Sequence, residues 1–269
     1  MFYNNPDNLF RASVVFKPEE SKKLLALAVS KLPEVVRALN EGIVIIGGGT
    51  TNAYIARAIT GRDIEVGRYT AGRIYNGLLD TTPVELRLKP VILIKGGHVE
   101  MPMSDALTKF TGNDVFIKGA NAVDPEGNAG VLAASDVGGT VGAFWALAIS
   151  RGANVICPVG LEKLIPSVPA AVMEAGQERF QFNMGKKVGL LQLSGAKVIT
   201  EIQALEVLYN LQAVQIAAGG IGGSQRFVGF FLEGGENGIR KMGGGLLKNK
   251  KKQEYLIPRI EDDGKKGGF

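Results

Sequence analysis

Residues 43–59, IVIIGGGTTNAYIARAI, form the segment on which the fold prediction rests. Four consecutive apolar, mostly β-branched residues predict a buried strand over 43–46. Three glycines and two threonines follow, and the apolar spacing after them predicts a helix over 51–59. The junction is suited either to holding an anion or to making a tight turn.

The three glycines favour the interpretation of the junction as an anion site. Gly47, Gly48 and Gly49 allow positive φ and a close approach of another group to the backbone. The first N–H groups of the helix lack intrahelical acceptors and, with the helix dipole, suit a phosphate or carboxylate. We expect Thr50 and Thr51 to add hydroxyl donors and a helix cap. The alternative is a threonine-capped turn without a ligand, because the segment lacks both the Lys-Ser/Thr of nucleotide triphosphatase loops and the spacing G-x-G-x-x-G.

Strand and helix patterns alternate along the rest of the chain. An amphipathic helix is predicted over 19–40, kinked or divided by Pro33. Further strands are predicted at 91–95, 115–118, 154–157, 196–199, 213–218 and 225–235, with helices at 140–150 and 200–210. This alternation predicts an α/β fold that is Rossmann-like and layered, with a mainly parallel sheet and helices on both faces. We expect one domain over 1–250, with 19–40 as a helical lead-in, and a charged tail over 251–269.

Composition narrows the function classes. Hydrophobic residues make up 45% and charged residues 21%, as in a folded globular protein. The apolar runs fall short of the roughly 20 residues that cross a membrane, and the N-terminus does not resemble a signal peptide, so we expect a cytoplasmic protein without a membrane partner. Much of the net charge of +5 falls in the last 24 residues, so no nucleic-acid partner is expected. With one histidine and one cysteine we expect no metal, and nothing indicates a cofactor.

Three segments together resemble one superfamily. These are residues 43–59, NDVFIKGANAVDPEGNAGVL at 113–132, and GGTVGAFWALAISRGANVICPVGLEKLIP at 138–166. Their order is similar to that of the ribose-5-phosphate isomerase, glucosamine-6-phosphate deaminase and CoA-transferase superfamily. Its members isomerise or deaminate sugar phosphates, transfer CoA, or sense effectors in repressors. The resemblance therefore implies a fold and does not settle the function.

The isomerases of that superfamily carry a sequence resembling Asp-Gly-Ala-Asp-Glu, whose carboxylates help to move a proton. This chain has Lys118-Gly119-Ala120-Asn121-Ala122 at the matching place. Lys118 and Asn121 replace the matched acids, and an amide does not accept a proton near neutral pH. Isomerase activity of that type is not expected, while Lys118 favours an anionic ligand and Asn121 remains a candidate contact.

The CoA-transferases use a glutamate nucleophile. Glu236-Asn237-Gly238 resembles part of their Ser-Glu-Asn-Gly signature. Gly235 replaces the serine, however, and the signature lies near the C-terminus instead of early in the fold. The alternative to a functional Glu236 is a solvent-facing loop.

Two residues that follow or end strands are further candidates. His98 follows a strand and is a candidate acid or base, because histidine titrates near neutral pH; the alternative is a surface histidine. Cys157 ends a strand and could be a nucleophile, but a small buried residue is the commoner role.

Two further segments are expected to line the pocket that would hold the ligand. SDVGGT, residues 135–140, leads into a helix whose start, with Gly139 and Thr140, would face the same ligand. Asp136 could act there as a base or hold a hydroxyl, or serve only as a cap. The glycine-rich turn at 217–223, which includes Gly219 and Gly220, would supply a further wall.

These candidates leave three functions open. The first is binding of a small anionic metabolite of the sugar-phosphate, nucleotide or CoA-ester class. The second is a CoA-transferase-like or sugar-phosphate-processing enzyme that uses Glu236, Asp136 or His98. The third is a structural component of an oligomer with a vestigial pocket, since apolar helices such as 140–150 permit a homo-oligomer.

Overall fold

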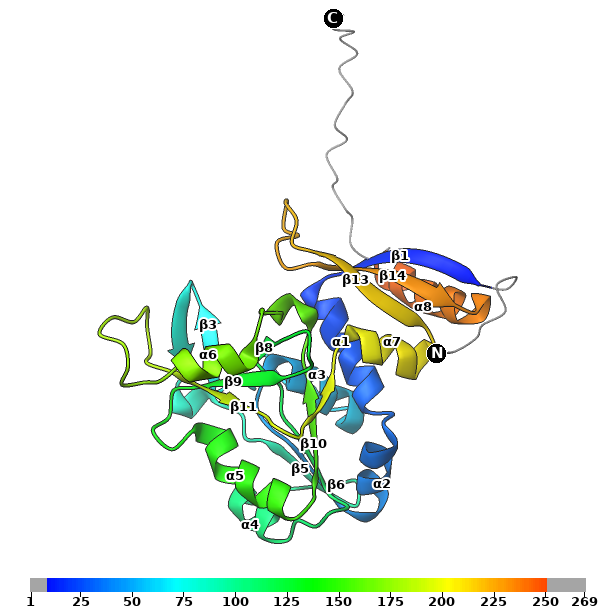
Figure 1. Ribbon diagram of the computed structural model, residues 1–269. Coiled ribbons are helices and arrows are strands. Elements are labelled where there is room, and N and C mark those ends of the chain that lie inside the picture. The colour runs from blue at the N-terminus through cyan, green and yellow to red at the C-terminus, as the bar shows by residue number, and fades with distance from the viewer. Residues whose placement is uncertain (1–8, 251–269) are drawn as a thin grey trace, which may run out of the picture.

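The computed structural model describes residues 9–250, without the side chains of 246–250. The chain forms a mixed α/β fold in which the main sheet has six strands in the order β12-β10-β7-β2-β5-β6 (Figure 1). These strands are β2 (Ile43–Ile46), β5 (Val91–Ile94), β6 (Gly97–Val99), β7 (Val115–Ile117), β10 (Asn154–Pro158) and β12 (Lys197–Ile199). The predicted charged tail, 251–269, lies outside the described residues.

The main sheet is parallel at one end only. Strands β2, β7, β10 and β12 are parallel neighbours, whereas β5 is antiparallel to β2 and pairs with β6 in a hairpin. The α/β class is therefore confirmed, and the expected parallel pairing holds for four of the six strands. Because Ile46 pairs with Ile117 and Ile117 with Ile156, the exits of β2, β7 and β10 lie side by side.

The helices follow the predicted pattern closely. Pro33 begins a second helix, so the predicted lead-in divides into α1 (Pro18–Val29) and α2 (Pro33–Glu41). The others that had been predicted are α3 (Thr50–Thr60), α5 (Gly139–Ser150) and α7 (Glu201–Tyr209). Helix α1 contacts α3, α7 and β10, while α5 contacts β9, β10 and α4. No helix in residues 9–250 is long and apolar enough to cross a membrane.

Three smaller antiparallel sheets surround this core, and the sequence patterns missed most of them. Strand β14 (Val228–Gly234) lies between β1 (Phe10–Phe16) and β13 (Gln212–Ala218), so the first and last strands are neighbours (Figure 1). Strand β9 (Ala129–Ala133) lies between β8 (Ala122–Val123) and β11 (Gly189–Gln192). Strands β3 (Gly72–Tyr75) and β4 (Leu78–Thr81) form a hairpin. The remaining helices are α4 (Met103–Thr108), α6 (Val168–Glu174) and α8 (Glu236–Lys250), with short 3-10 turns η2 (Val84–Leu86) and η3 (Leu161–Lys163).

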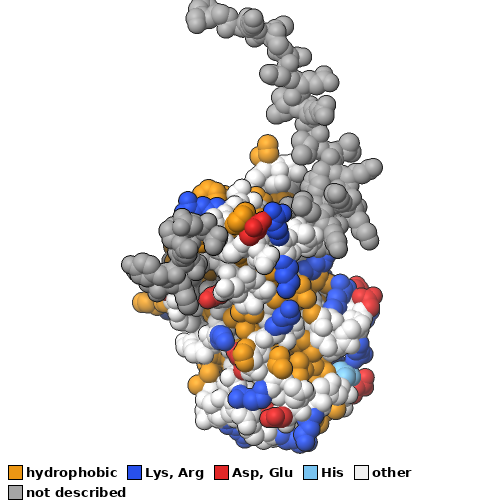
Figure 2. Space-filling model, turned by 90° about the vertical axis from the view of Figure 1, so that its right-hand side faces the viewer, with side chains coloured by type: hydrophobic (Ala, Val, Ile, Leu, Met, Phe, Trp, Pro, Cys, Tyr) orange, Lys and Arg blue, Asp and Glu red, His pale blue; other side chains and the backbone are white. Residues whose placement is uncertain are grey.

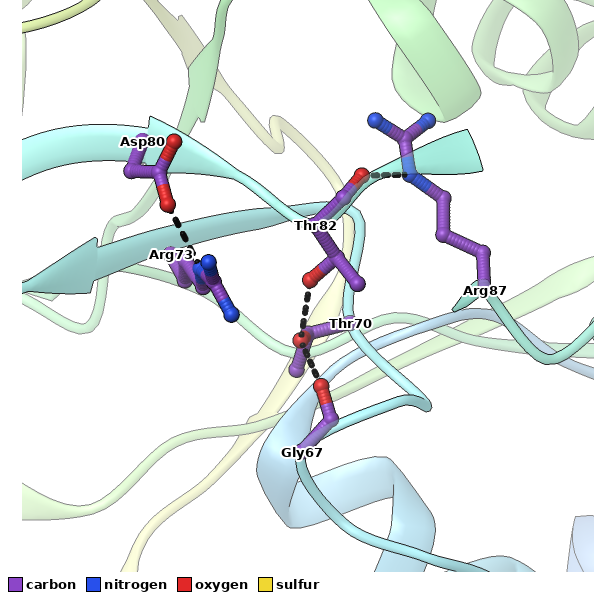
Figure 3. A network of polar contacts seen from close by, with 6 residues as sticks. All are labelled: Gly67, Thr70, Arg73, Asp80, Thr82 and Arg87. Carbon is purple, nitrogen blue, oxygen red and sulfur yellow. Dashed lines mark hydrogen bonds and ion pairs between the residues drawn. The ribbon is translucent and has the colours of Figure 1, made fainter. Parts of the chain in front are cut away.

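The base of the β3–β4 hairpin is tied to the body by a chain of polar contacts, drawn in Figure 3. The hydroxyls of Thr70 and Thr82 lie 3.2 Å apart, and Thr70 also donates to the carbonyl of Gly67. Arg87 donates to the carbonyl of Thr82 at 2.6 Å. Farther along the hairpin, Arg73 bonds Asp80 across the two strands. These bonds fix the segment around residues 67–72, which borders the glycine loop.

The core between α5 and the sheet depends on stacking of Phe144 on Phe116, with ring centroids 3.6 Å apart and both side chains buried. Phe144→Ala is expected to lower the free energy of unfolding by about 3–5 kcal/mol, because it leaves a cavity beside β7. Phe182→Ala is the matched control, since Phe182 is 82% exposed. Urea unfolding of the two variants measures the difference, and equal losses would contradict this account of the core.

Candidate functional site

The predicted glycine loop lies at the exit of β2, where the chain turns into α3. Of its amides, Gly47 N–H donates to the carbonyl of Ile117 at 2.9 Å and Gly49 N–H to that of Tyr69 at 2.6 Å. The N–H groups of Gly48 and of the first three residues of α3 have no acceptor in the described part of the chain. The free donors are therefore fewer than the sequence predicted, and they gather at the start of α3.

Helix α3 begins without the predicted threonine cap. Gly49 is the N-cap residue, with φ 156° and ψ 149°, and no side chain caps the helix. Thr50 and Thr51 are instead the first two helical residues, so their hydroxyls do not take the capping position. The prediction of the cap is wrong because the loop is one residue shorter than expected. This leaves the first N–H groups of α3 free to bind something else.

Tyr69 holds the loop in shape, and no local sequence signal identified it. Its hydroxyl donates to the carbonyl of Ile46 at 2.6 Å and accepts from Val91 N–H at 2.9 Å. Its main-chain oxygen accepts a hydrogen bond from Gly49 N–H. The side chain is 1% exposed, and burial raises the pKa of its hydroxyl. Tyr69 thus fixes both the end of β2 and the middle of the loop.

Asn52 brings a buried acceptor to the same place. Its Nδ2 donates to the carbonyls of Gly47 at 2.7 Å and Ile117 at 3.2 Å, which orients the amide. Its Oδ1 has no donor among the described residues, although the side chain is fully buried. A buried acceptor without a partner is costly, so this oxygen is available to a hydroxyl or N–H group of a ligand or to water.

Lys118 extends from the exit of β7 along the glycine loop. Its Nζ lies 3.4 Å from the carbonyl oxygens of both Gly48 and Gly119, and it forms no ion pair with any described residue. Burial lowers the pKa of the amine to about 8, with a smaller lowering by Lys163, while Cys157 acts in the opposite direction. Lys118 therefore lies beside the glycine loop.

Sequence reasoning missed two more lysines here: the charge of Lys163 acts on Lys118, and Lys22 in turn lies near Lys163. Lys163 in η3 donates to the carbonyl of Ala120 at 2.9 Å, just beyond the exit of β7. Burial and then the charge of Lys163 lower the pKa of Lys22 on α1, partly opposed by Glu162 and Glu19. Like Lys118, Lys22 and Lys163 make no direct ion pair within residues 9–250. The three amines, hereafter the lysine cluster, give this edge of the sheet a positive charge that Glu162 and Glu19 offset only in part.

A buried carboxyl group holds the turn that carries Lys163. Glu201, at the first turn of α7, accepts from Leu161 N–H at 2.9 Å and is fully buried. Burial raises its pKa, and the nearby Glu162 raises it further. The sequence signal that could have identified Lys163 is a lysine a few residues after a predicted strand, because Lys118 also lies at the end of a predicted strand.

Other predicted residues make structural contacts of their own. Asn121 Oδ1 accepts from Leu132 N–H at 3.0 Å, which joins β8 to β9 and engages the oxygen expected to touch a ligand. Cys157 is buried within β10, and burial raises the pKa of its thiol to about 12, so it matches the structural alternative.

The predicted second and third walls lie on other elements. Gly139 and Thr140 begin α5, after the exposed Asp136, and α5 contacts α4, β9 and β10. Gly219 and Gly220 are exposed in the hairpin between β13 and β14, which belongs to a separate sheet. Within the described structure, no hydrogen bond or strand pairing joins these residues to the glycine loop.

The remaining candidate acids and bases are also dispersed. His98 is exposed on the edge strand β6, opposite Leu93, and histidine appears in pale blue at the surface in Figure 2. Glu236 begins α8 and bonds Arg240 one turn later at 2.6 Å, so the expectation of a loop there is wrong. A helix forms because the acidic residue at its start and Arg240 stabilise it across one turn.

A surface depression of about 410 Å³ lies elsewhere, beside the β3–β4 hairpin. Its lining residues are Tyr75, Asn76, Leu78, Leu79, Asp80, Gly185 and Lys186. None of the residues predicted for the site lines it. The depression lies where the β3–β4 hairpin meets the loop at Gly185 and Lys186. The unpaired N–H donors and the amines lie elsewhere, at the exits of β2, β7 and β10.

Comparisons of the chain with models of protein families, with curated proteins and with solved structures found no match.

The pKa of Lys118 predicts a gain of stability when the charge is removed. Lys118→Met is expected to raise the free energy of unfolding at pH 7 by about 1–3 kcal/mol, since one pKa unit is worth about 1.4 kcal/mol. Below pH 8 the amine is charged in both states and its burial is unfavourable. Between about pH 8 and 10.5 the unfolded chain binds more protons, so the stability of the unsubstituted protein rises with pH and the gain disappears.

Denaturant unfolding at pH 7 and pH 10.5 measures this effect. Lys187→Met is the matched control, because Lys187 lies at the surface beside Glu178. A Lys118→Met variant that is less stable than the parent at pH 7 would contradict the assignment of a buried, unpaired amine.

Proposed function

We propose that the chain binds a small anionic metabolite at the start of α3, between the glycine loop and the lysine cluster. The observation that supports this most directly is the juxtaposition of unpaired N–H groups with Lys118, which has no ion pair among residues 9–250. Helix N-termini of this kind bind phosphate and carboxylate groups, because their amides and dipole point at the ligand. Cations without partners lower the free energy of the bound anion further.

The charge of the site favours a phosphate over a monocarboxylate. Lys118, Lys163 and Lys22 belong to three different elements that meet at this edge of the sheet. Several amines beside free amides best match a group with more than one negative charge and several acceptor oxygens. Sugar phosphates, nucleotides and CoA esters all carry such a group. We also propose that the chain belongs to the superfamily that it resembles, with the helices layered on both faces of the sheet as in a Rossmann-like fold.

The binding function is preferred over an enzyme that uses the three predicted catalytic residues. Asp136 lies on a loop, Glu236 on α8 and His98 on β6, and within residues 9–250 no hydrogen bond or ion pair joins any two of them. Acid–base catalysis needs its groups within hydrogen-bond reach of the same substrate atoms. An activity that depends on these three residues would therefore need a site other than the one at α3.

The position of Thr50 allows a sharp test of the amides. Thr50→Pro removes one N–H at the first helical position, where proline is well accommodated and no intrahelical bond is lost. The ψ of Gly49, 149°, lies in the range that a following proline requires. The affinity for inorganic phosphate, measured by isothermal titration calorimetry, is expected to fall roughly 10–100-fold, as for loss of one hydrogen bond to a charged group.

Thr50→Ala is the matched control, because it removes the hydroxyl and keeps the N–H. It is expected to weaken phosphate binding less than Thr50→Pro does. Thermal shifts with a panel of sugar phosphates, nucleotides and CoA esters would then identify the ligand class. Equal phosphate affinity of Thr50→Pro and the parent would show that these amides do not hold the anion.

A further inference from the structure

We propose that the Lys118 amine is a nucleophile that forms a Schiff base with an aldehyde or ketone bound at this site. The inference rests on the proposed function in one respect, since the anion site would orient a carbonyl compound that carries a phosphate or carboxylate. It goes beyond binding, because it assigns a covalent step to this chain.

The surroundings of Lys118 favour a reactive amine. Among the described residues its Nζ has two hydrogen-bond acceptors, the carbonyl oxygens of Gly48 and Gly119, each at the long distance of 3.4 Å. No carboxylate within the described chain forms an ion pair with it, whereas Lys187 and Lys197 each have a glutamate partner. Without a carboxylate partner the amine lacks an ion pair that would favour its charged form, and two carbonyl acceptors at 3.4 Å favour that form only weakly.

Burial keeps part of the Lys118 amine neutral, and the charge of Lys163 adds to this effect. From β10 Lys118 faces the Cys157 thiol, which is itself largely protonated because burial raises its pKa to about 12. From η3 it faces the positive charge of Lys163. With a pKa of about 8, roughly a tenth of the amine is neutral at pH 7, on the order of 100-fold more than for an ordinary lysine. A lysine activated by burial and a neighbouring cation is a recognised nucleophile for carbonyl carbon.

The step balances without any further reagent. The lone pair of neutral Nζ forms a bond to the carbonyl carbon, and the π electrons move to the oxygen. The nitrogen then loses a proton and the oxygen gains one, which gives a carbinolamine. The nitrogen lone pair expels the hydroxyl group, which leaves as water with one added proton, and the nitrogen loses its last hydrogen to give the neutral imine. The sum is amine plus carbonyl giving imine plus water.

The free N–H groups at the start of α3 have a second role in this step. Negative charge develops on the carbonyl oxygen as Nζ attacks, and preorganised amide donors stabilise such a charge. Lys118 Nζ lies 3.4 Å from the carbonyl oxygen of Gly48, so the amine is next to the turn that carries these amides. The expected ligand class is a small carbonyl compound with an acidic group, such as a 2-oxo acid or a phosphorylated aldehyde.

Reductive trapping tests the proposal on the full chain. The protein is incubated at pH 7 with sodium cyanoborohydride and either glyoxylate, an anionic aldehyde, or glycolaldehyde, a neutral one. Mass spectrometry of the digest then maps the reduced adducts. Lys118 is expected to be labelled at least tenfold faster than Lys187 and Lys109, and faster by glyoxylate than by glycolaldehyde.

Two variants connect the labelling to its cause. Lys118→Arg is expected to abolish the fast adduct, because guanidinium remains charged. Lys163→Met removes a neighbouring charge, so it is expected to raise the pH midpoint of Lys118 labelling by glycolaldehyde, a probe that does not need the anion site. If Lys163 contributed only to packing, Lys163→Met would leave the pH midpoint of Lys118 labelling unchanged.

The outcomes separate this inference from the proposed function. Fast labelling of Lys118 by both aldehydes without preference for glyoxylate supports the Schiff base and counts against the anion site. Phosphate binding that Thr50→Pro weakens, combined with labelling of Lys118 no faster than Lys187, overturns the Schiff base and leaves the anion site in place. Because the adduct is mapped on the unsubstituted chain, poor folding of a variant does not decide the result.

Discussion

The geometry of the site depends on the two ends of Tyr69. Its hydroxyl joins the last residue of β2 to the first residue of β5, and its main-chain oxygen binds the amide of Gly49. In the loop, the N–H groups of Gly47 and Gly49 therefore bind carbonyl oxygens, whereas that of Gly48 and the first ones of α3 have no acceptor in the described chain. Without this anchor the glycines could adopt many conformations, since glycine is the least restricted residue. The polar chain from Gly67 to Arg87 in turn holds the segment that contains Tyr69.

A second constraint is the parallel pairing of β2, β7 and β10. It places the glycine loop, Lys118 and Lys163 at one edge of the sheet, although they are widely separated in sequence. The same pairing brings the partly buried amines of Lys118 and Lys163 near each other, and the repulsion of their like charges opposes folding. An anion that binds the folded chain would offset this cost by mass action. The site thus combines an unfavourable charge arrangement in the free protein with a favourable one in the bound state.

The sequence predicted what is local and missed what is distant. Strand β2, helix α3 and the break at Pro33 follow from short-range patterns, and the structure confirms them. The role of Tyr69 could not be predicted, because its partners Ile46 and Val91 are each more than twenty residues away. Strand β1 was missed since its pairing with β14 joins opposite ends of the chain. For the same reason the sequence did not reveal that Asp136, His98 and Glu236 lie on elements other than the glycine loop, which the topology shows.

The most direct test is to follow the backbone amides of a ¹⁵N-labelled sample by NMR while inorganic phosphate is added. The account predicts that the largest saturable shifts fall on Gly48, Thr50 and Thr51, whose N–H groups are free. Gly47 and Gly49, whose amides already bind carbonyls, should move less. Saturable shifts that cluster on other elements, or none at the start of α3, would contradict the assignment of this turn as an anion site.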